Sequence, residues 1–150
     1  MLNVGDSAPL FSADSTTGPL DLSQWINNQP IVLIFYPQDF TPGCTKQLCA
    51  VRDSKALYER NDAIVLGINA GSLQTHRDFA EQHDYDFPIV SDSNGRIRKA
   101  YGVSKILGIA MQQRTVFIIA PGGKIVFAEK GNRPTEELIG VLERLRNKRR

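Results

Sequence analysis

The hydrophobic pattern of the chain combines short runs that are apolar almost throughout with longer stretches of mixed polarity. Two such runs, residues 31–36 and 63–69, are rich in β-branched side chains. Runs of this kind are typical of strands buried on both faces of a sheet. Residues 8–22 are rich in turn-forming residues instead, with short apolar stretches on either side of a Thr-Thr-Gly-Pro segment. They predict an N-terminal hairpin.

Three more strands and four helices are expected along the rest of the chain. The strands are residues 87–90, 114–120 and 124–128, of which the last two flank a Pro-Gly-Gly turn and form an antiparallel hairpin. The helices span about residues 44–60, 72–83, 94–101 and 134–146. Ser72 is the predicted N-cap of the second helix, and Pro134 opens the last one.

Apart from the short strand over residues 87–90 and the short helix over residues 94–101, the order of these elements is strand–helix–strand–helix, then strand–strand–helix. This order predicts an α/β fold with a mixed central sheet. The loop formed by residues 37–44 leaves the C-terminal end of a strand expected at the centre of that sheet. Open α/β sheets place their active sites at such a position.

Length and composition fit one soluble globular domain over residues 1–150. The chain is 41% hydrophobic and 23% charged, and it has no apolar run long enough to cross a membrane. The first residues resemble no signal peptide, so the cytoplasm is the expected compartment. Among the last seven residues, 144–150, five are basic. We interpret this tail as the basic C-terminus of a helix rather than as a nucleic-acid binding segment.

The two cysteines of the chain are the most informative polar positions. Cys44 lies where the helix after the 37–44 loop is expected to begin, and Cys49 follows five residues later. A helix start favours the thiolate, which is the reactive form of cysteine. Two alternatives remain: a buried structural pair, and a zinc site that adds His76 and His83 as ligands. The spacing of these histidines fits zinc poorly, and both are expected on a helix surface.

A larger thiolate population alone does not make a fast peroxide-reducing site. A free cysteine with a pKa of about 8.5 is about 3% thiolate at pH 7, so full ionisation gains only about 30-fold. The remaining acceleration requires groups that stabilise charge on the leaving oxygen. The candidates are the Thr41 hydroxyl, the N–H groups of Gly43 and Cys44, and the guanidinium of Arg114. Pro37 and Pro42 shape and shield the loop.

The spacing of the cysteines also makes a mechanical prediction. On an ideal helix, residues i and i+5 are about 7.5 Å apart along the axis and point about 140° away from each other. A disulfide requires converging side chains with Cα atoms within about 7 Å. Cys44 and Cys49 therefore meet only if the first turns of the helix unwind.

The sequence around Cys44 resembles the active-site signature of the peroxiredoxins. The signature here is Pro37-x-x-x-Thr41-x-x-Cys44, and the longer run resembles the subgroup of peroxiredoxin Q and bacterioferritin comigratory protein. The matching residues of that longer run are Phe35-Tyr36-Pro37, Thr41-Pro42-Gly43-Cys44-Thr45, Cys49 and Arg52-Asp53, together with Arg114-Thr115 before a later apolar strand. The resemblance covers most of the chain.

This resemblance implies a thioredoxin-like fold with an N-terminal extension, and thiol-dependent reduction of hydrogen peroxide and organic hydroperoxides without metal or flavin. Cys44 would be the peroxidatic cysteine and Cys49 the resolving one, joined as a disulfide in the oxidised form. Thr41, Arg114 and the backbone from Pro37 through Gly43 to Cys44 would bind the peroxide. Thioredoxin or a similar dithiol protein would be the reductant. An intramolecular disulfide needs no partner chain, so a monomer is expected.

Two other functions compete with this interpretation. One is general thiol–disulfide exchange, which normally uses a Cys-x-x-Cys motif that this chain lacks. The other is a non-enzymatic binding or holdase role that uses the basic tail or an exposed apolar surface.

Overall fold

The computed structural model describes residues 1–106 and 111–148. Its centre is a five-stranded mixed sheet with the order β5-β4-β3-β6-β7. The bounds are β3 Ile31–Phe35, β4 Ile64–Asn69, β5 Ile89–Ser91, β6 Thr115–Ile119 and β7 Ile125–Lys130. Strands β4 and β5 continue parallel to β3, whereas β6 and β7 run antiparallel to their neighbours. The α/β fold with a mixed central sheet is confirmed.

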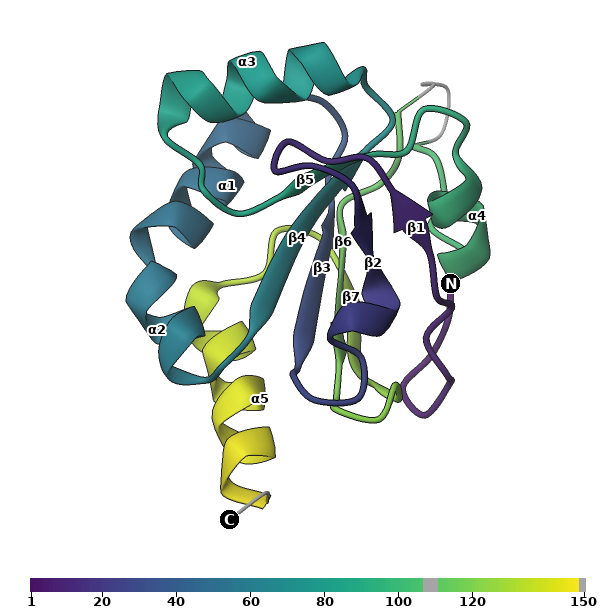
Figure 1. Cartoon of the computed structure of the whole chain (residues 1–150), viewed down its shortest axis with the longest axis vertical. Coiled ribbons are helices and arrows are strands. Elements are labelled where there is room, and N and C mark those ends of the chain that lie inside the picture. Colours follow the sequence, from purple (N-terminus) through teal and green to yellow (C-terminus); the bar gives the residue numbers. More distant parts are fainter. Residues whose placement is uncertain (107–110, 149–150) are drawn as a thin grey trace.

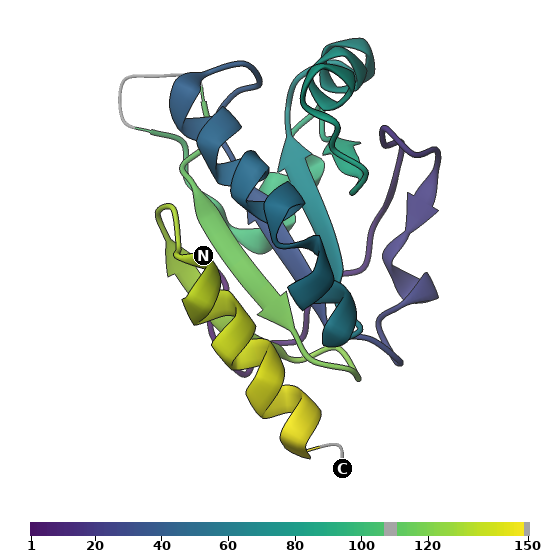
Figure 2. The ribbon, with the colours of Figure 1, turned by 90° about the vertical axis from the view of Figure 1, so that its left-hand side faces the viewer.

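Helices cover both faces of this sheet (Figures 1 and 2). Their bounds are α1 Pro42–Asp53, α2 Lys55–Arg60, α3 Leu73–His83, α4 Arg96–Tyr101 and α5 Thr135–Lys148. The predicted N-terminal hairpin is present as β1 Ser12–Ala13 and β2 Leu20–Asp21, followed by a short 3-10 helix, η1 Leu22–Gln24.

Alternation along the strands divides the core into two layers. On β3, Val32 and Ile34 face a layer completed by α1, α2, α3 and α5. Leu33 and Phe35 face the opposite layer, which the hairpin and α4 complete. All five residues of β3 are buried, because the strand is central and covered on both faces.

The predicted helix over residues 44–60 is two helices in the structure. It begins two residues earlier, at Pro42, and is interrupted at Ser54, whose N–H donates to the carbonyls of Ala50 and Val51. The apolar positions of this stretch follow an irregular stripe, and the interruption lets each half turn its apolar side to the sheet. The last helix runs through Lys148, so residues 144–148 of the basic tail are its final turns. Arg149 and Arg150 lie outside the described residues.

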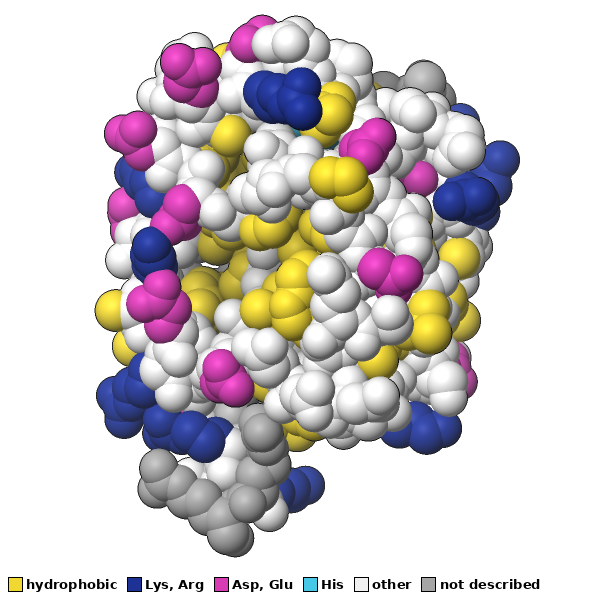
Figure 3. Space-filling model, in the orientation of Figure 1, with side chains coloured by type: hydrophobic (Ala, Val, Ile, Leu, Met, Phe, Trp, Pro, Cys, Tyr) yellow, Lys and Arg dark blue, Asp and Glu magenta, His cyan; other side chains and the backbone are white. Residues whose placement is uncertain are grey.

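The helical layer leaves part of the sheet uncovered. Figure 3 shows an apolar hollow on this side of the molecule, between the α1–α2 pair and the neighbouring strands β4 and β5. Its lining includes Trp25, Val51, Tyr58 and Phe87. No helix in the described part of the chain is long and apolar enough to cross a membrane.

Candidate active site

Cys44 lies in the first turn of α1, at the end of the loop that leaves the central strand β3. The helix has Thr41 as its N-cap and Pro42 as its first residue, so Cys44 is the third helical residue. The N–H groups of a first turn have no carbonyl within the helix to bond, and they form a partial positive charge. The side chain of Cys44 is buried in the helical core layer and is a free thiol. The structure thus places a single thiol where backbone dipoles favour an anion.

Arg114 reaches this helix start from the far side of β3. Thr115, the first residue of β6, is paired with Phe35, the last residue of β3. This register brings Arg114 beside the loop that begins after Phe35. Its Nη1 donates to Oε1 of Gln47 at 2.8 Å, and its Nη2 would stand 2.7 Å from a Cβ added to Gly43. The guanidinium is therefore packed against the residue that precedes Cys44.

The Thr41 hydroxyl belongs to the same helix start. It donates to the carbonyl of Gln38 at 2.9 Å and makes no capping bond to the helix. Its proton is thus used within the loop, and its oxygen lone pairs remain available to accept a hydrogen bond from another group. Thr41 is half-buried, whereas Gly43 is exposed. A small polar ligand can reach both.

Two side-chain amides hold the beginning of the loop, and the sequence interpretation included neither. Nδ2 of Asn69 donates to the carbonyls of Tyr36 and Pro37, each at 2.8 Å. Nε2 of Gln112 donates to the carbonyls of Tyr36 and Ile68, at 2.9 and 2.7 Å. Pro37 is therefore fixed through its backbone at the point where the chain leaves β3.

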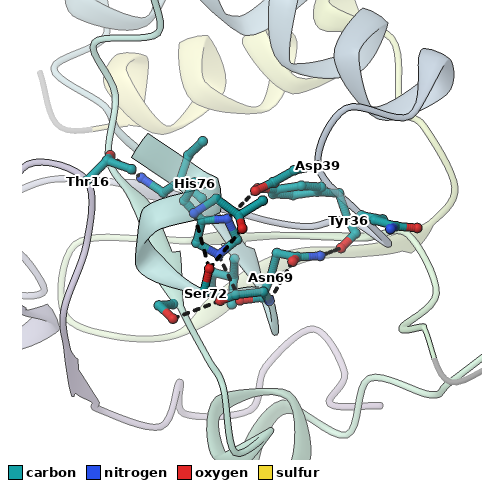
Figure 4. A network of polar contacts seen from close by, with 12 residues as sticks. Thr16, Tyr36, Asp39, Asn69, Ser72 and His76 are labelled. Atoms are coloured by element: carbon teal, nitrogen blue, oxygen red, sulfur yellow. Dashed lines mark hydrogen bonds and ion pairs between the residues drawn. The ribbon is translucent and has the colours of Figure 1, made fainter. Parts of the chain in front are cut away.

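A buried polar network holds the middle of the loop. Figure 4 shows Asp39 between Tyr36 and His76, with Asn69 on the other side of the imidazole. The Tyr36 hydroxyl donates to Oδ1 of Asp39 at 2.5 Å, and Nδ1 of His76 lies 2.5 Å from Oδ2. Burial and the charge of Asp39 raise the pKa of Tyr36 far above its usual range, so the hydroxyl keeps its proton.

The position of His76 corrects one prediction. We expected both histidines on a helix surface, but His76 is completely buried and only His83 is partly exposed. A signal was present in the sequence: His76 lies three and four residues before Phe79 and Ala80, the buried positions of α3. The Asp39 carboxylate is the buried partner that makes this position tolerable for an imidazole.

The residue after Asp39 carries backbone strain. Phe40 has a φ of 63°, in the left-handed region that bulky residues rarely adopt. Its ring packs on that of Phe79 with centroids 5.0 Å apart, although Phe40 is still 44% exposed. The Asp39 network and this aromatic contact together stabilise the strained turn at Phe40, which leads into α1.

Cys49 lies in the same helix as Cys44 and is also a free thiol, half-buried at the edge of the core. Its Sγ atom is 3.2 Å from the hydroxyl of Tyr85, which the sequence interpretation did not include. Arg52, one turn further along α1, donates to the carbonyl of His83 and to Asp53. Both cysteines are thus in one intact helix and are not bonded to each other.

A zinc site requires several ligand side chains that converge on one point. Within residues 1–106 and 111–148, no three side chains of the His, Cys, Asp and Glu types converge in a way that could hold a metal ion. Of the four ligands considered, His76 is bonded to Asp39, and Cys49 contacts Tyr85. The zinc alternative therefore has no support in the geometry.

The site and fold can be compared with known proteins. Residues 4–128 match the AhpC/TSA family. The chloroplastic peroxiredoxin Q of Sedum lineare is 35% identical over 122 residues, which are 81% of this chain and 65% of that protein. A putative peroxiredoxin bcp of Coxiella burnetii is 32% identical over 83% of this chain and 85% of its own length. The chain thus spans about two thirds or less of several plant relatives, for example 63% of a rice peroxiredoxin Q.

Solved structures of peroxiredoxins superpose on nearly the whole chain. The crystal structure of the peroxidoxin BcpB from Mycobacterium tuberculosis superposes with a TM-score of 0.87 at 30% identity, over 96% of this chain and 98% of that one. A mutant of Xylella fastidiosa PrxQ superposes with a TM-score of 0.86 at 26% identity, over 100% and 99% of the two chains. The chain belongs to the AhpC/TSA family and, within it, to the peroxiredoxins of the Q and bacterioferritin comigratory protein type.

Proposed function

We propose that this protein is a thiol-dependent peroxidase that reduces hydrogen peroxide and organic hydroperoxides at Cys44. The observation that carries the proposal is the guanidinium of Arg114 against Gly43, next to a thiol in the first turn of a helix. A permanent cation and unpaired N–H groups there would stabilise negative charge both on the sulfur and on an oxygen leaving it. Thr41 would accept a hydrogen bond from the peroxide and so orient it.

In the first step, the Cys44 thiolate attacks the terminal oxygen of the hydroperoxide. A sulfur–oxygen bond forms, the oxygen–oxygen bond breaks, and the departing alkoxide takes up a proton to become an alcohol, or water when the substrate is hydrogen peroxide. The sulfur is oxidised to a sulfenic acid by two electrons, and the peroxide is reduced by the same two. Neither a metal nor an organic cofactor is needed for this balance.

In the second step, the Cys49 thiolate attacks the sulfur of the Cys44 sulfenic acid. A disulfide forms, and the hydroxide that leaves is protonated to water. Because both cysteines lie in α1, separated by five positions, the first turns of the helix must unwind for their sulfurs to meet. Thioredoxin or a similar dithiol protein would then reduce the disulfide by exchange and become oxidised itself.

The proposed oligomeric state and location follow from this cycle. A disulfide within one chain requires no second copy, so we propose a monomer. Free thiols persist in a reducing compartment, and we keep the cytoplasm as the proposed location. The competing activity, general thiol–disulfide exchange, would use the same two cysteines but would not need Arg114 or a peroxide.

The proposal is tested by counting free thiols and measuring intact mass before and after one equivalent of hydrogen peroxide, at low protein concentration. We expect both thiols to disappear, with a mass decrease of two hydrogens in a monomeric species. The Cys44→Ser variant should keep its remaining thiol. An unreactive wild-type protein would overturn the peroxidase function, and rapid oxidation with an added oxygen but no disulfide would overturn the role of Cys49.

A further inference from the structure

The hydroxyl of Tyr85 bridges two points of α1. It donates to the carbonyl of Thr45 at 3.1 Å and lies 3.2 Å from Sγ of Cys49. Tyr85 itself is in the segment that follows α3, 40 residues away from Thr45 in the sequence. Thr45 is the neighbour of Cys44, so one hydroxyl group contacts both ends of the helical stretch between the two cysteines.

A count of protons determines what this bridge requires. A tyrosine hydroxyl has one proton, and here it is donated to the Thr45 carbonyl. The contact with Cys49 is then a hydrogen bond from the thiol to the tyrosine oxygen. Both bonds exist only while Cys49 is protonated and α1 is folded. Unwinding α1 between Cys44 and Cys49 breaks both of them.

The tyrosine ring is itself held firmly. It stacks with His83 and with Phe87, with centroid separations of 5.5 and 5.2 Å, and makes a T-shaped contact with Phe79 at 5.2 Å. Tyr85 is 6% exposed. Because the ring has little freedom left to lose, its hydroxyl makes the two bonds without a large further entropy loss.

A second contact joins the same segments. Nη1 of Arg52 donates to the carbonyl of His83 at 2.8 Å, one turn beyond Cys49 on α1. The segment from His83 to Tyr85 therefore lies along α1 from Thr45 to Arg52. Of these contacts, those of Tyr85 lie in the part that must unwind, and that of Arg52 lies beyond it.

We propose that Tyr85 is a positioning residue that holds α1 folded in the reduced enzyme and thereby sets how fast Cys49 reaches the Cys44 sulfenic acid. The inference rests on the proposed function, since it concerns the resolving step of that reaction. While Cys49 is held, a second hydroperoxide can oxidise the sulfenic acid to a sulfinic acid and leave as an alcohol. Tyr85 thus determines how the sulfenic acid divides between disulfide and sulfinic acid.

The substitution Tyr85→Phe tests this, because it removes the hydroxyl and keeps the stacked ring. In the reduced protein without peroxide, we expect amide hydrogen exchange of residues 45–50 to become roughly three- to tenfold faster, the loss typical of one or two hydrogen bonds. The matched control is Tyr101→Phe, which loses one hydrogen bond to the carbonyl of Pro9 on the other face of the sheet. Exchange in α1 that is equal in the wild type and in Tyr85→Phe would overturn the proposal.

The second measurement follows the products at excess peroxide by intact mass. Tyr85→Phe should lower the fraction of sulfinic acid several-fold relative to the wild type and to Tyr101→Phe, with the initial rate of Cys44 oxidation equal in all three. An unchanged or larger sulfinic fraction, or an equal decrease in the control, would contradict the role of Tyr85. A wild-type Cys44 that does not react with peroxide would instead refute the proposed function, and the exchange measurement would still decide whether Tyr85 holds the helix.

Discussion

The guanidinium of Arg114 lies over the Cα atom of Gly43, so that a methyl group added to this glycine would stand 2.7 Å from Nη2. The φ angle of Gly43 is not in the left-handed region, so its backbone does not require glycine. The absence of a side chain serves the close approach of the cation to the start of α1. This contact connects the signature loop to a residue 71 positions later in the chain.

Gly43→Ala should therefore separate activity from stability. The added methyl group forces Arg114 away from the helix start, and we expect the rate of Cys44 oxidation to fall roughly tenfold, less than for complete removal of such a donor. The free energy of unfolding should stay equal or rise slightly, because alanine favours the helix. Stopped-flow measurement of thiol oxidation and urea unfolding give the two values.

Gly140→Ala is the matched control for this substitution. Gly140 is also in a helix, α5, and an added Cβ would meet Arg144 only at an ordinary 3.7 Å. It should stabilise the protein by about 0.5–1 kcal/mol without any change in the oxidation rate. A Gly43→Ala variant that oxidises as fast as Gly140→Ala would show that the position of Arg114 does not matter for the reaction.

Asp39→Asn tests the buried network below the signature loop. The amide keeps the size of the side chain but cannot serve as the charged partner of both Tyr36 and His76. We expect a loss of about 1–3 kcal/mol in the free energy of unfolding, together with slower oxidation of Cys44 as the loop loosens. Asp92→Asn is the control: Asp92 is a buried carboxylate that accepts hydrogen bonds at the start of α4, away from the site. Asp92→Asn should lower the free energy of unfolding without changing the rate of Cys44 oxidation. If both variants changed that rate equally, the Asp39 network would have no specific role in the reaction.

Cys49→Ser should leave the rate of Cys44 oxidation by peroxide unchanged and should block formation of the disulfide. The serine hydroxyl can still bond to Tyr85, so α1 is expected to stay folded. With thioredoxin as reductant, one equivalent of peroxide should be consumed as the Cys44 sulfenic acid accumulates, and a second, slower equivalent as it becomes a sulfinic acid, after which consumption should stop. Peroxide consumption assayed together with intact mass follows both events, and sustained turnover at the wild-type rate would assign resolution to another thiol.

Alkaline pH should destabilise the protein through its tyrosines. All four are buried: burial raises the pKa of Tyr58 to about 12, and it raises the pKa values of Tyr36, Tyr85 and Tyr101 above their usual range. A tyrosine in the unfolded chain ionises near pH 10, so above about pH 10 the unfolded state releases protons that the folded state retains. The stabilisation is complete below about pH 10 and decreases as the pH rises, by about 1.4 kcal/mol per pH unit for Tyr58 alone.

Ultraviolet absorbance and circular dichroism, recorded in one alkaline titration, check this expectation. Tyrosinate absorbance should appear together with the loss of helical signal, as one transition. In Tyr58→Phe, the free energy of unfolding should fall less steeply with pH. Ionisation of most tyrosines in a chain that is still folded would contradict the buried state of these side chains.

The elements with strong local patterns were predicted from the sequence, and the structure shows the physical origin of those patterns. The strand over residues 31–36 is apolar throughout because it is central and covered on both faces. Ser72 caps α3 as expected, through a hydrogen bond from the N–H of Thr75. The break at Ser54 was missed, because it depends on how two short helices share one sheet and leaves no strong breaker in the sequence.

The site was predictable only where its residues are close in sequence. Thr41, Gly43 and Cys44 form one segment, and Arg114 was a candidate because the chemistry needs a permanent cation and because Arg114-Thr115 resembles a family pattern; the structure places its guanidinium against Gly43. Tyr85 and Gln112 act on the site through contacts that span more than 35 residues. Such pairs are determined by tertiary packing, of α1 against the segment after α3 for Tyr85 and at the ends of β3 and β4 for Gln112, which no periodicity in a single sequence reveals. The exception is His76, whose spacing from Phe79 and Ala80 did indicate a buried position.

The interruption at Ser54 determines how far a conformational change in α1 can spread. A helix melts cooperatively, so in a continuous helix an opening that began at Cys44 could travel on and pull Tyr58 out of the core. Since α1 ends at Asp53 and α2 begins anew at Lys55, the two are separate cooperative segments. The unwinding that the proposed resolving step requires would then be confined to the 12 residues of α1, and repeated cycles would not approach the global unfolding that exposes the sheet to aggregation or proteolysis.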